Sequence, residues 1–182
     1  MMRRDWFPKA YADVVARLRV PFGFLLLVLF LLLSRPGTPS LRWGMPVAAL
    51  GLMVRAWAAG HLAKNERLAT GGPYAFVRNP LYAGTLLTAA GFAIASRSGM
   101  LAGIFAVVFL LVYLPVIELE EQHLRKLFPE YASYAERTPM LWPRWAAMRG
   151  AQRFRWSLYV RNQEYKALAA SAAGALYLAW RA

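Results

Sequence analysis

The sequence predicts an all-α membrane protein with about five transmembrane helices. Hydrophobic residues make up 59% of the 182 residues and charged residues only 17%, whereas soluble globular chains carry about 25% charged residues. The remaining charge is one-sided, with 22 Lys and Arg against 9 Asp and Glu. In so apolar a chain, this excess is typical of cytoplasmic loops rather than of nucleic-acid binding. The absence of cysteine excludes disulfides, thiol nucleophiles and cysteine-based metal sites.

The first predicted span covers residues 14–34, where leucine, valine and phenylalanine dominate. About 20 apolar residues in a helix cross a bilayer core of ~30 Å. Arg3 and Arg4 resemble the charged start of a signal peptide. Residues 34–37 offer no small-x-small cleavage site, however, so we expect an anchor that is retained.

Four further apolar segments follow. The second span covers residues 43–63 and is interrupted only by Arg55. The third and fourth spans, residues 80–96 and 98–117, are separated by a single residue, which predicts a tight helical hairpin. The last segment, residues 167–180, reaches only ~21 Å at 1.5 Å per residue. It therefore either spans a thinned bilayer or lies partly in the interface.

The distribution of cations predicts the orientation. With five spans, 17 of the 22 Lys and Arg residues fall on the face that carries the N-terminus and the loops after the second and fourth spans. The positive-inside rule assigns this face to the cytoplasm. In the last of these loops, residues 153–161 mix arginines with aromatic residues and predict an interfacial helix on anionic lipid. We therefore expect a multi-pass protein whose N-terminus and large loops are cytoplasmic.

The loop between the second and third spans is polar but rich in aromatic residues. Its Gly-Gly-Pro sequence at residues 71–73 predicts a turn. Asn79 and Pro80 predict a helix start, with Asn79 as the N-cap and Pro80 at the first helical position. Such a helix N-terminus with Arg78 beside it attracts a carboxylate or a phosphate. The alternative is an interfacial loop whose arginine binds lipid headgroups.

The end of the fourth span carries three acids. At 100° per residue, Glu120 points into the middle of the local apolar arc, Glu121 lies at its edge and Glu118 faces away. A carboxylate directed inward at the membrane boundary is costly unless a cation or hydrogen-bond donors meet it. We expect Glu120 either to form a structural pair with Arg78 or Arg55, or to bind a cationic ligand.

The predicted hairpin brings these two segments together. An antiparallel hairpin returns the chain to the face that it left, so residues 78–82 and the acid pair at 120–121 should be neighbours despite the intervening residues. We therefore expect one pocket on the cytoplasmic side.

Two motifs flank the hairpin. The first reads Gly-Pro-Tyr at residues 72–74 and Arg-Asn-Pro-Leu-Tyr-Ala-Gly at 78–84, and the second reads Glu-Glu-Gln-His-Leu at 120–124, followed by Phe128, Tyr131 and Tyr134. In this order they resemble the isoprenylcysteine carboxyl methyltransferase family and, more loosely, the related phospholipid methyltransferases. The resemblance implies one integral membrane domain over residues 1–182, with the methyltransferase core at about 61–143 and a C-terminal interfacial and membrane helix at 150–182.

The resemblance implies an enzyme that transfers a methyl group from S-adenosylmethionine to a lipid-like or prenylated acceptor at the cytoplasmic membrane face, by carboxylate O-methylation or a related reaction. It makes Arg78 and Glu120 the candidate catalytic residues and requires no metal. Carboxylates and aromatic faces suit the sulfonium and ammonium of the cofactor, and an arginine at a helix start suits its carboxylate. The candidate cofactor-binding residues are His61, Gly72, Pro73, Tyr74, Arg78, Asn79, Pro80, Tyr82, Glu120 and Glu121.

Two departures from the family pattern concern the acceptor. Asn79 stands where the family usually has histidine, and Val116 stands where the carboxyl methyltransferases tend to have an arginine. If that arginine orients an acceptor carboxylate, Arg55 or Arg78 must replace it here. A phenol, an amine or a different carboxylate therefore stays open as the acceptor group.

Three further polar residues have simpler interpretations. His61, at the end of the second span, either contacts the cofactor or caps a helix, and His123 is expected in solvent. Arg55 is expected to face the bundle interior as the partner of a glutamate.

Two other functions remain open: a lipid or sterol-type reductase that uses NADPH on a similar scaffold, and a non-enzymatic membrane protein. The expected partners are membrane lipids and a lipid-like small-molecule acceptor, not nucleic acid.

Overall fold

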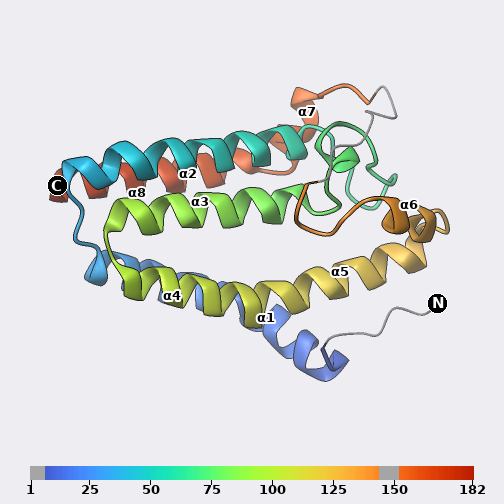
Figure 1. Ribbon diagram of the computed structural model, residues 1–182. Coiled ribbons are helices and arrows are strands. Elements are labelled where there is room, and N and C mark those ends of the chain that lie inside the picture. Colours follow the sequence, from blue (N-terminus) through green and yellow to red (C-terminus); the bar gives the residue numbers. More distant parts are fainter. Residues whose placement is uncertain (1–6, 144–151) are drawn as a thin grey trace.

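The computed structural model describes residues 7–143 and 152–182. Within these ranges the regular structure is entirely helical, with no strand, which confirms the predicted all-α class (Figure 1). The elements are α1 (Lys9–Leu33), α2 (Thr38–Ala59), the 3₁₀ turn η1 (Gly72–Ala75), α3 (Pro80–Ser96), α4 (Gly99–Val108), the π-helical turn η2 (Phe109–Tyr113), α5 (Leu114–Leu127), α6 (Tyr131–Arg137), α7 (Trp156–Arg161) and α8 (Glu164–Arg181).

Most predicted spans coincide with helices, although several boundaries differ. Helix α3 has the predicted bounds, and it ends where Arg97 takes the left-handed conformation with φ 51°. Helix α2 begins and ends earlier than predicted, because Gly37 and Ser40 cap its start through the Ser40 hydroxyl and the chain turns after Ala59. Helices α4 and α5 join through η2 into one helix that continues ten residues beyond the predicted end at Ile117.

Among the described residues, two helices are long and apolar enough to cross a membrane, namely α1 and the continuous helix Gly99–Leu127. Helix α3 is a shorter apolar helix. Helices α3 and α4 are joined by Arg97 and Ser98 and run in opposite directions (Figure 1).

Small residues let α2 and α3 pack with their backbones in close contact. A Cβ atom on Gly51 would lie 2.5 Å from the backbone nitrogen of Thr88, and a Cβ atom on Gly91 would lie 2.3 Å from that of Ala48. Glycine is required at such positions because the facing backbone occupies the space of a side chain. This close pair forms a fixed frame for the polar residues at the start of α3.

Two apolar clusters hold the other helices around this pair. Phe30, Leu101 and Leu178 join α1, α4 and α8 near one end of the bundle. At the other end, Val15 of α1 packs against Val112 and Val116 of η2 and α5. The helices thus enclose a shared interior, with one apolar cluster near each end of the bundle.

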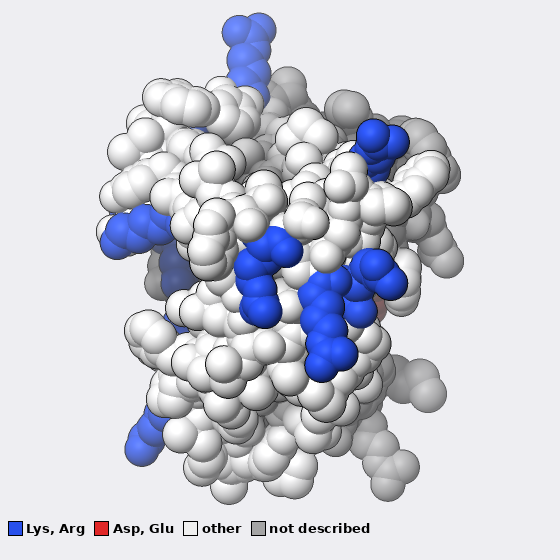
Figure 2. All heavy atoms as spheres, turned by 90° about the vertical axis from the view of Figure 1, so that its left-hand side faces the viewer, with Lys and Arg blue, Asp and Glu red and all other residues white. Residues whose placement is uncertain are grey.

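The two ends of the bundle carry different segments. The α1–α2 and α3–α4 connections and the C-terminus lie at one end, while the segment between α2 and α3, α6 and α7 lie at the other (Figure 1). The first end is shown in Figure 2, where Lys and Arg side chains stand on a surface that is otherwise mostly uncharged. The exposed arginines of these connections and of the C-terminus are Arg35, Arg42, Arg97 and Arg181. The polar motifs lie at the opposite end.

Candidate active site

A buried ion pair connects the segment before α3 to α5. The Arg78 Nε lies 3.1 Å from the Glu121 Oε1, and the two side chains are only 3% and 7% exposed. The Arg78 Nη1 also donates a hydrogen bond to the carbonyl of Ala135 at 2.9 Å, and its backbone N–H donates to the carbonyl of Pro139 at 2.8 Å. Residues 78–82 and the acid pair therefore lie together, as the sequence predicts.

The prediction that Glu120 is the inward-pointing acid is wrong. Glu121 is buried against Arg78, whereas Glu120 is exposed. The apolar arc in the sequence was shifted toward Glu120 by Leu127, which is 40% exposed in the structure. In a helix with a lipid-facing side, apolar residues mark that side as well as the protein interior, so an apolar arc does not locate the buried face.

The start of α3 supplies one donor to each acid. Asn79 is the residue before the first turn, as predicted, but its side chain makes no capping hydrogen bond. Instead, its Nδ2 donates to the Glu121 Oε1 at 3.0 Å. One turn later, the Tyr82 hydroxyl donates to the Glu120 Oε1 at 3.0 Å. Glu120 is thus the accessible carboxylate of the pair, and the aromatic ring of Tyr82 lies beside it.

The Gly-Pro-Tyr motif forms a buried support behind this cluster. Pro73 and Tyr74 lie in the turn η1 and are buried, and the Tyr134 hydroxyl donates to the Tyr74 carbonyl at 2.7 Å. Burial raises the pKa of the Tyr74 and Tyr134 hydroxyls above the ordinary value, so both remain protonated at neutral pH. Tyr74 therefore supports the site from behind, and its aromatic ring is not exposed to a ligand.

His61 and Gly72 form a second, separate contact. Gly72 has a φ of +58°, and a Cβ atom there would lie 2.6 Å from the His61 ring. His61 is 4% exposed. Its Nδ1 lies 2.8 Å from the Trp57 carbonyl oxygen and its Nε2 lies 3.1 Å from that of Gln152. Of the two interpretations of His61, this geometry matches the structural one at the end of α2.

Arg55 faces the bundle interior as the partner of a glutamate, as expected. The partner is Glu164, at the start of α8, and not one of the acids at the end of the predicted fourth span. The Arg55 Nε and Nη2 donate to the two carboxylate oxygens of Glu164 at 2.5 and 3.0 Å, and its Nη1 donates to the Thr85 hydroxyl. An arginine within an apolar segment requires such a partner, so the single acid at the start of the last apolar segment was the available signal.

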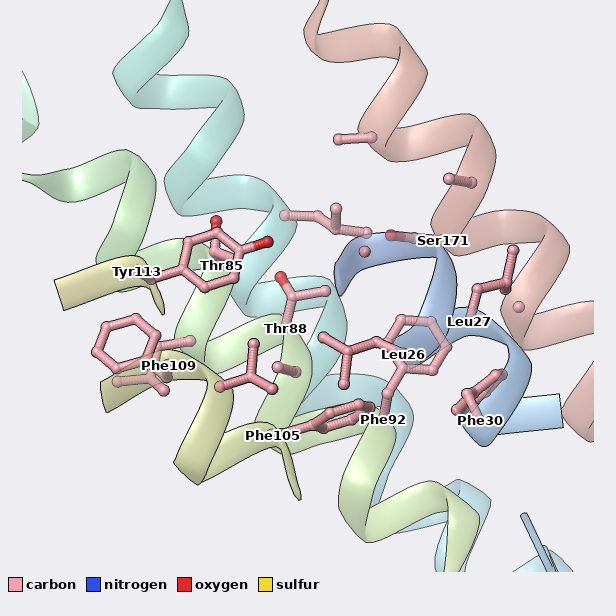
Figure 3. Close-up of a pocket in the computed structure, with 18 of the residues that line it drawn as sticks. Leu26, Leu27, Phe30, Thr85, Thr88, Phe92, Phe105, Phe109, Tyr113 and Ser171 are labelled. Atoms are coloured by element: carbon pink, nitrogen blue, oxygen red, sulfur yellow. The ribbon is translucent and has the colours of Figure 1, made fainter. Parts of the chain in front are cut away.

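A mostly apolar cavity of about 420 Å³ lies between α1, α2, α3, the α4–η2 segment and α8. Tyr113 and Thr85 lie at one end of it, and Phe30 and Phe92 lie toward the other (Figure 3). Arg78, Glu120 and Glu121 are not among its walls. The sequence predicts one cytoplasmic pocket at those residues and gives no indication of Tyr113.

Tyr82 links this cavity to the acid pair. Its ring lies edge-on to the ring of Tyr113, with centroids 6.3 Å apart, and its hydroxyl bonds to Glu120. Tyr113 in turn stacks on Phe109 at 6.2 Å, and both belong to the π turn η2. Such turns frequently occur at functional sites. The aromatic contacts thus run without a break from the cavity wall to the exposed carboxylate.

The remaining predictions lie away from this cluster. His123 is exposed, as expected. The predicted interfacial segment 153–161 contains the short helix α7, where Trp156 is 66% exposed and stacks on Tyr159 with centroids 4.7 Å apart. Phe154 packs instead on Gly60, where a Cβ atom would lie 2.1 Å from its ring.

The sequence of this segment was compared with those of known protein families. Residues 44–131 match the family model described as phospholipid methyltransferase. This part of the chain belongs to that family. The match contains most of α2 and all of α3, α4, η2 and α5, and therefore all of the residues at the start of α3 and both acids. It confirms the resemblance at the level of the family.

Two curated relatives carry names from metal resistance. The cobalt-zinc-cadmium resistance protein CzcN of Cupriavidus metallidurans is 37% identical over 121 residues, which cover 65% of this chain and 55% of the relative. The nickel-cobalt-cadmium resistance protein NccN of Alcaligenes xylosoxydans xylosoxydans is 37% identical over 108 residues, which cover 58% and 49%. The chain spans about half the length of the curated relatives it matches. No solved structure matches it.

Proposed function

We propose that this phospholipid methyltransferase family member transfers a methyl group from S-adenosylmethionine to a lipid-like acceptor at the cytoplasmic face of a membrane. The observation that supports it most is the contact network of Arg78, Asn79, Tyr82, Glu120 and Glu121 within the family segment. The acceptor group is a carboxylate, a hydroxyl or an amine.

The residues of this network fit a cofactor with two positive charges. Glu120 is exposed and accepts a hydrogen bond from the neutral Tyr82 hydroxyl, so its carboxylate can pair with an ammonium or a sulfonium. The Tyr82 ring beside it suits a cation. S-adenosylmethionine supplies an electrophilic methyl group when bound, so the chain's own task is to align the acceptor and exclude water.

The structure changes the role proposed for Arg78. Its guanidinium is 3% exposed and already paired with Glu121, so we assign it to positioning: it holds α5 against the start of α3 and thereby fixes Glu120 next to Tyr82. Glu120 remains the proposed catalytic residue. Asn79 ties the same two elements together through Glu121.

We further propose five membrane spans, with the site end of the bundle in the cytoplasm. Two long helices, α1 and Gly99–Leu127, and the apolar helix α3 support the spans. The excess of Lys and Arg in the segments at the site end supports the orientation. The bidentate contact of Arg55 with Glu164 supports α8 as a member of the bundle.

The test uses the full chain purified in mild detergent. Isothermal titration with S-adenosylhomocysteine and, separately, with NADPH distinguishes a methyltransferase from a reductase, and we expect only the first to bind. The Glu120→Gln variant should lose this binding, while the His123→Gln variant, which changes an exposed residue on the same helix, should retain it. Binding of NADPH alone, or unchanged binding by Glu120→Gln, would contradict the proposal.

The acceptor is then sought directly. The protein is incubated with isotopically methyl-labelled S-adenosylmethionine and a total lipid extract, and mass spectrometry identifies the molecule that gains the label. The reductase alternative predicts no transfer of the label.

A further inference from the structure

We propose that the cavity behind Tyr113 binds the single apolar chain of the methyl acceptor and determines which chain lengths are accepted. This inference rests on the proposed methyl transfer for its biological meaning, but it concerns the bundle interior rather than the acid pair. It assigns specificity to Gly23, Phe92 and Gly174, of which only Phe92 lies within the family segment.

The dimensions of the cavity suit one chain. Its α3 wall runs from Thr85 to Phe92, which corresponds to a depth of about 10 Å at 1.5 Å per residue. Its volume of about 420 Å³ lies toward the lower end of the ~300–1,000 Å³ range of small-molecule sites. The two chains of a diacyl lipid each extend about half of the ~30 Å bilayer core, so together they exceed this space.

The two ends of the cavity differ chemically. At the site end stand the hydroxyl groups of Tyr113 and Thr85 (Figure 3), and Tyr113 contacts Tyr82, which bonds to Glu120. The far end is aromatic, with the Phe30 and Phe92 rings edge-to-face and their centroids 5.7 Å apart. A molecule with a polar head and an apolar tail therefore fits in one direction, with its head toward the acid pair.

Glycines create the space for this chain. A Cβ atom on Gly23 would meet no other atom within 4 Å, although Gly23 lies in the cavity wall. At the far end, a Cβ atom on Gly174 would lie 3.2 Å from the Phe92 ring. A side chain at position 23, on the exposed rim of the cavity, thus finds open space, whereas Phe92 and Gly174 together form the cavity floor.

The experiment measures binding of chains of increasing length. Saturated single-chain fatty acids, and in a parallel series fatty amines, compete with cis-parinaric acid for the purified full chain in mild detergent. Each added methylene should tighten binding about fourfold until the chain reaches the floor, after which the gain should stop. The Phe92→Leu variant should move this break to longer chains.

Two glycine variants provide the matched comparison. Gly23→Leu should weaken every chain at least tenfold, whereas Gly103→Leu, at a helical glycine with equally open surroundings but outside the cavity, should leave binding unchanged. Diacyl phosphatidylethanolamine should compete at least tenfold less well than the best single chain. Equal competition by the diacyl lipid, or unchanged binding by Gly23→Leu, would overturn the inference.

Titration with S-adenosylhomocysteine on the same samples separates this inference from the proposed function. Length-dependent chain binding without cofactor binding would support the cavity assignment and refute the methyltransferase. Cofactor binding without length-dependent chain binding would support the methyltransferase and refute the cavity assignment.

Discussion

The same substitution at the two adjacent glutamates of α5 should reduce the stability of the protein by very different amounts. Glu121→Gln leaves the Arg78 guanidinium, 3% exposed, without a negative partner, and removing one member of a buried ion pair costs about 3–5 kcal/mol. Glu120→Gln retains an acceptor for the Tyr82 hydroxyl at an exposed position. Its effect should stay within the ~0.5–1.5 kcal/mol of a single hydrogen bond.

The free energies of unfolding can be compared in mixed micelles of mild detergent and sodium dodecyl sulfate, with tryptophan fluorescence as the signal, since the chain has 7 tryptophans. A third variant, Arg78→Met combined with Glu121→Leu, removes both charges and should recover most of the loss, because an apolar pair can replace a buried ion pair. Equal stability of the two single variants, or a double variant as unstable as Glu121→Gln, would refute the assignment of Glu121 as the buried acid.

Three further predictions concern the frame of the site. Glu164→Gln should expose α8 to proteolysis, because Arg55 loses a charged bidentate partner; unchanged cleavage rates would show that this pair does not anchor α8. Gly51→Ala should cost about 1–3 kcal/mol by overpacking α2 against α3, measured by unfolding in mixed micelles, whereas Gly103→Ala should cost nothing. The raised pKa of Tyr134 means that the folded state holds this proton more tightly, so its contribution to stability is complete below about pH 10 and is lost as the pH rises above that value. Tyr134→Phe should therefore reduce the alkaline loss of stability, and an unchanged pH profile would contradict this.

The sequence was most informative where local chemistry decides the structure. Pro80 begins α3 because proline fits the first helical turn, and the chain reverses at Arg97, so the predicted bounds of α3 hold. The same reversal brings Arg78 to the acid pair, since a helix that returns must end near its starting level. Neither result required knowledge of any distant contact.

The rest depended on contacts that a pattern of residues does not encode. Glu164 is 109 residues from Arg55, and no periodicity links them. The cavity is lined by glycines such as Gly23, whose contribution is the absence of a side chain. Hydropathy does not separate an exposed apolar side of α5 from its buried side, and the exposed Leu127 therefore points to Glu120 instead of Glu121.

The π turn Phe109–Tyr113 has a consequence for which acid meets the arginine. A π turn contains one residue more than an α turn, and one residue corresponds to 100° of rotation. Relative to α4, each residue of α5 therefore occupies the angular position that its predecessor would occupy in an unbroken α-helix. Without the π turn, the same helix would present Glu120 toward Arg78 and turn Glu121 away. One extra residue in the helix thus determines which of the two neighbouring carboxylates pairs with the arginine.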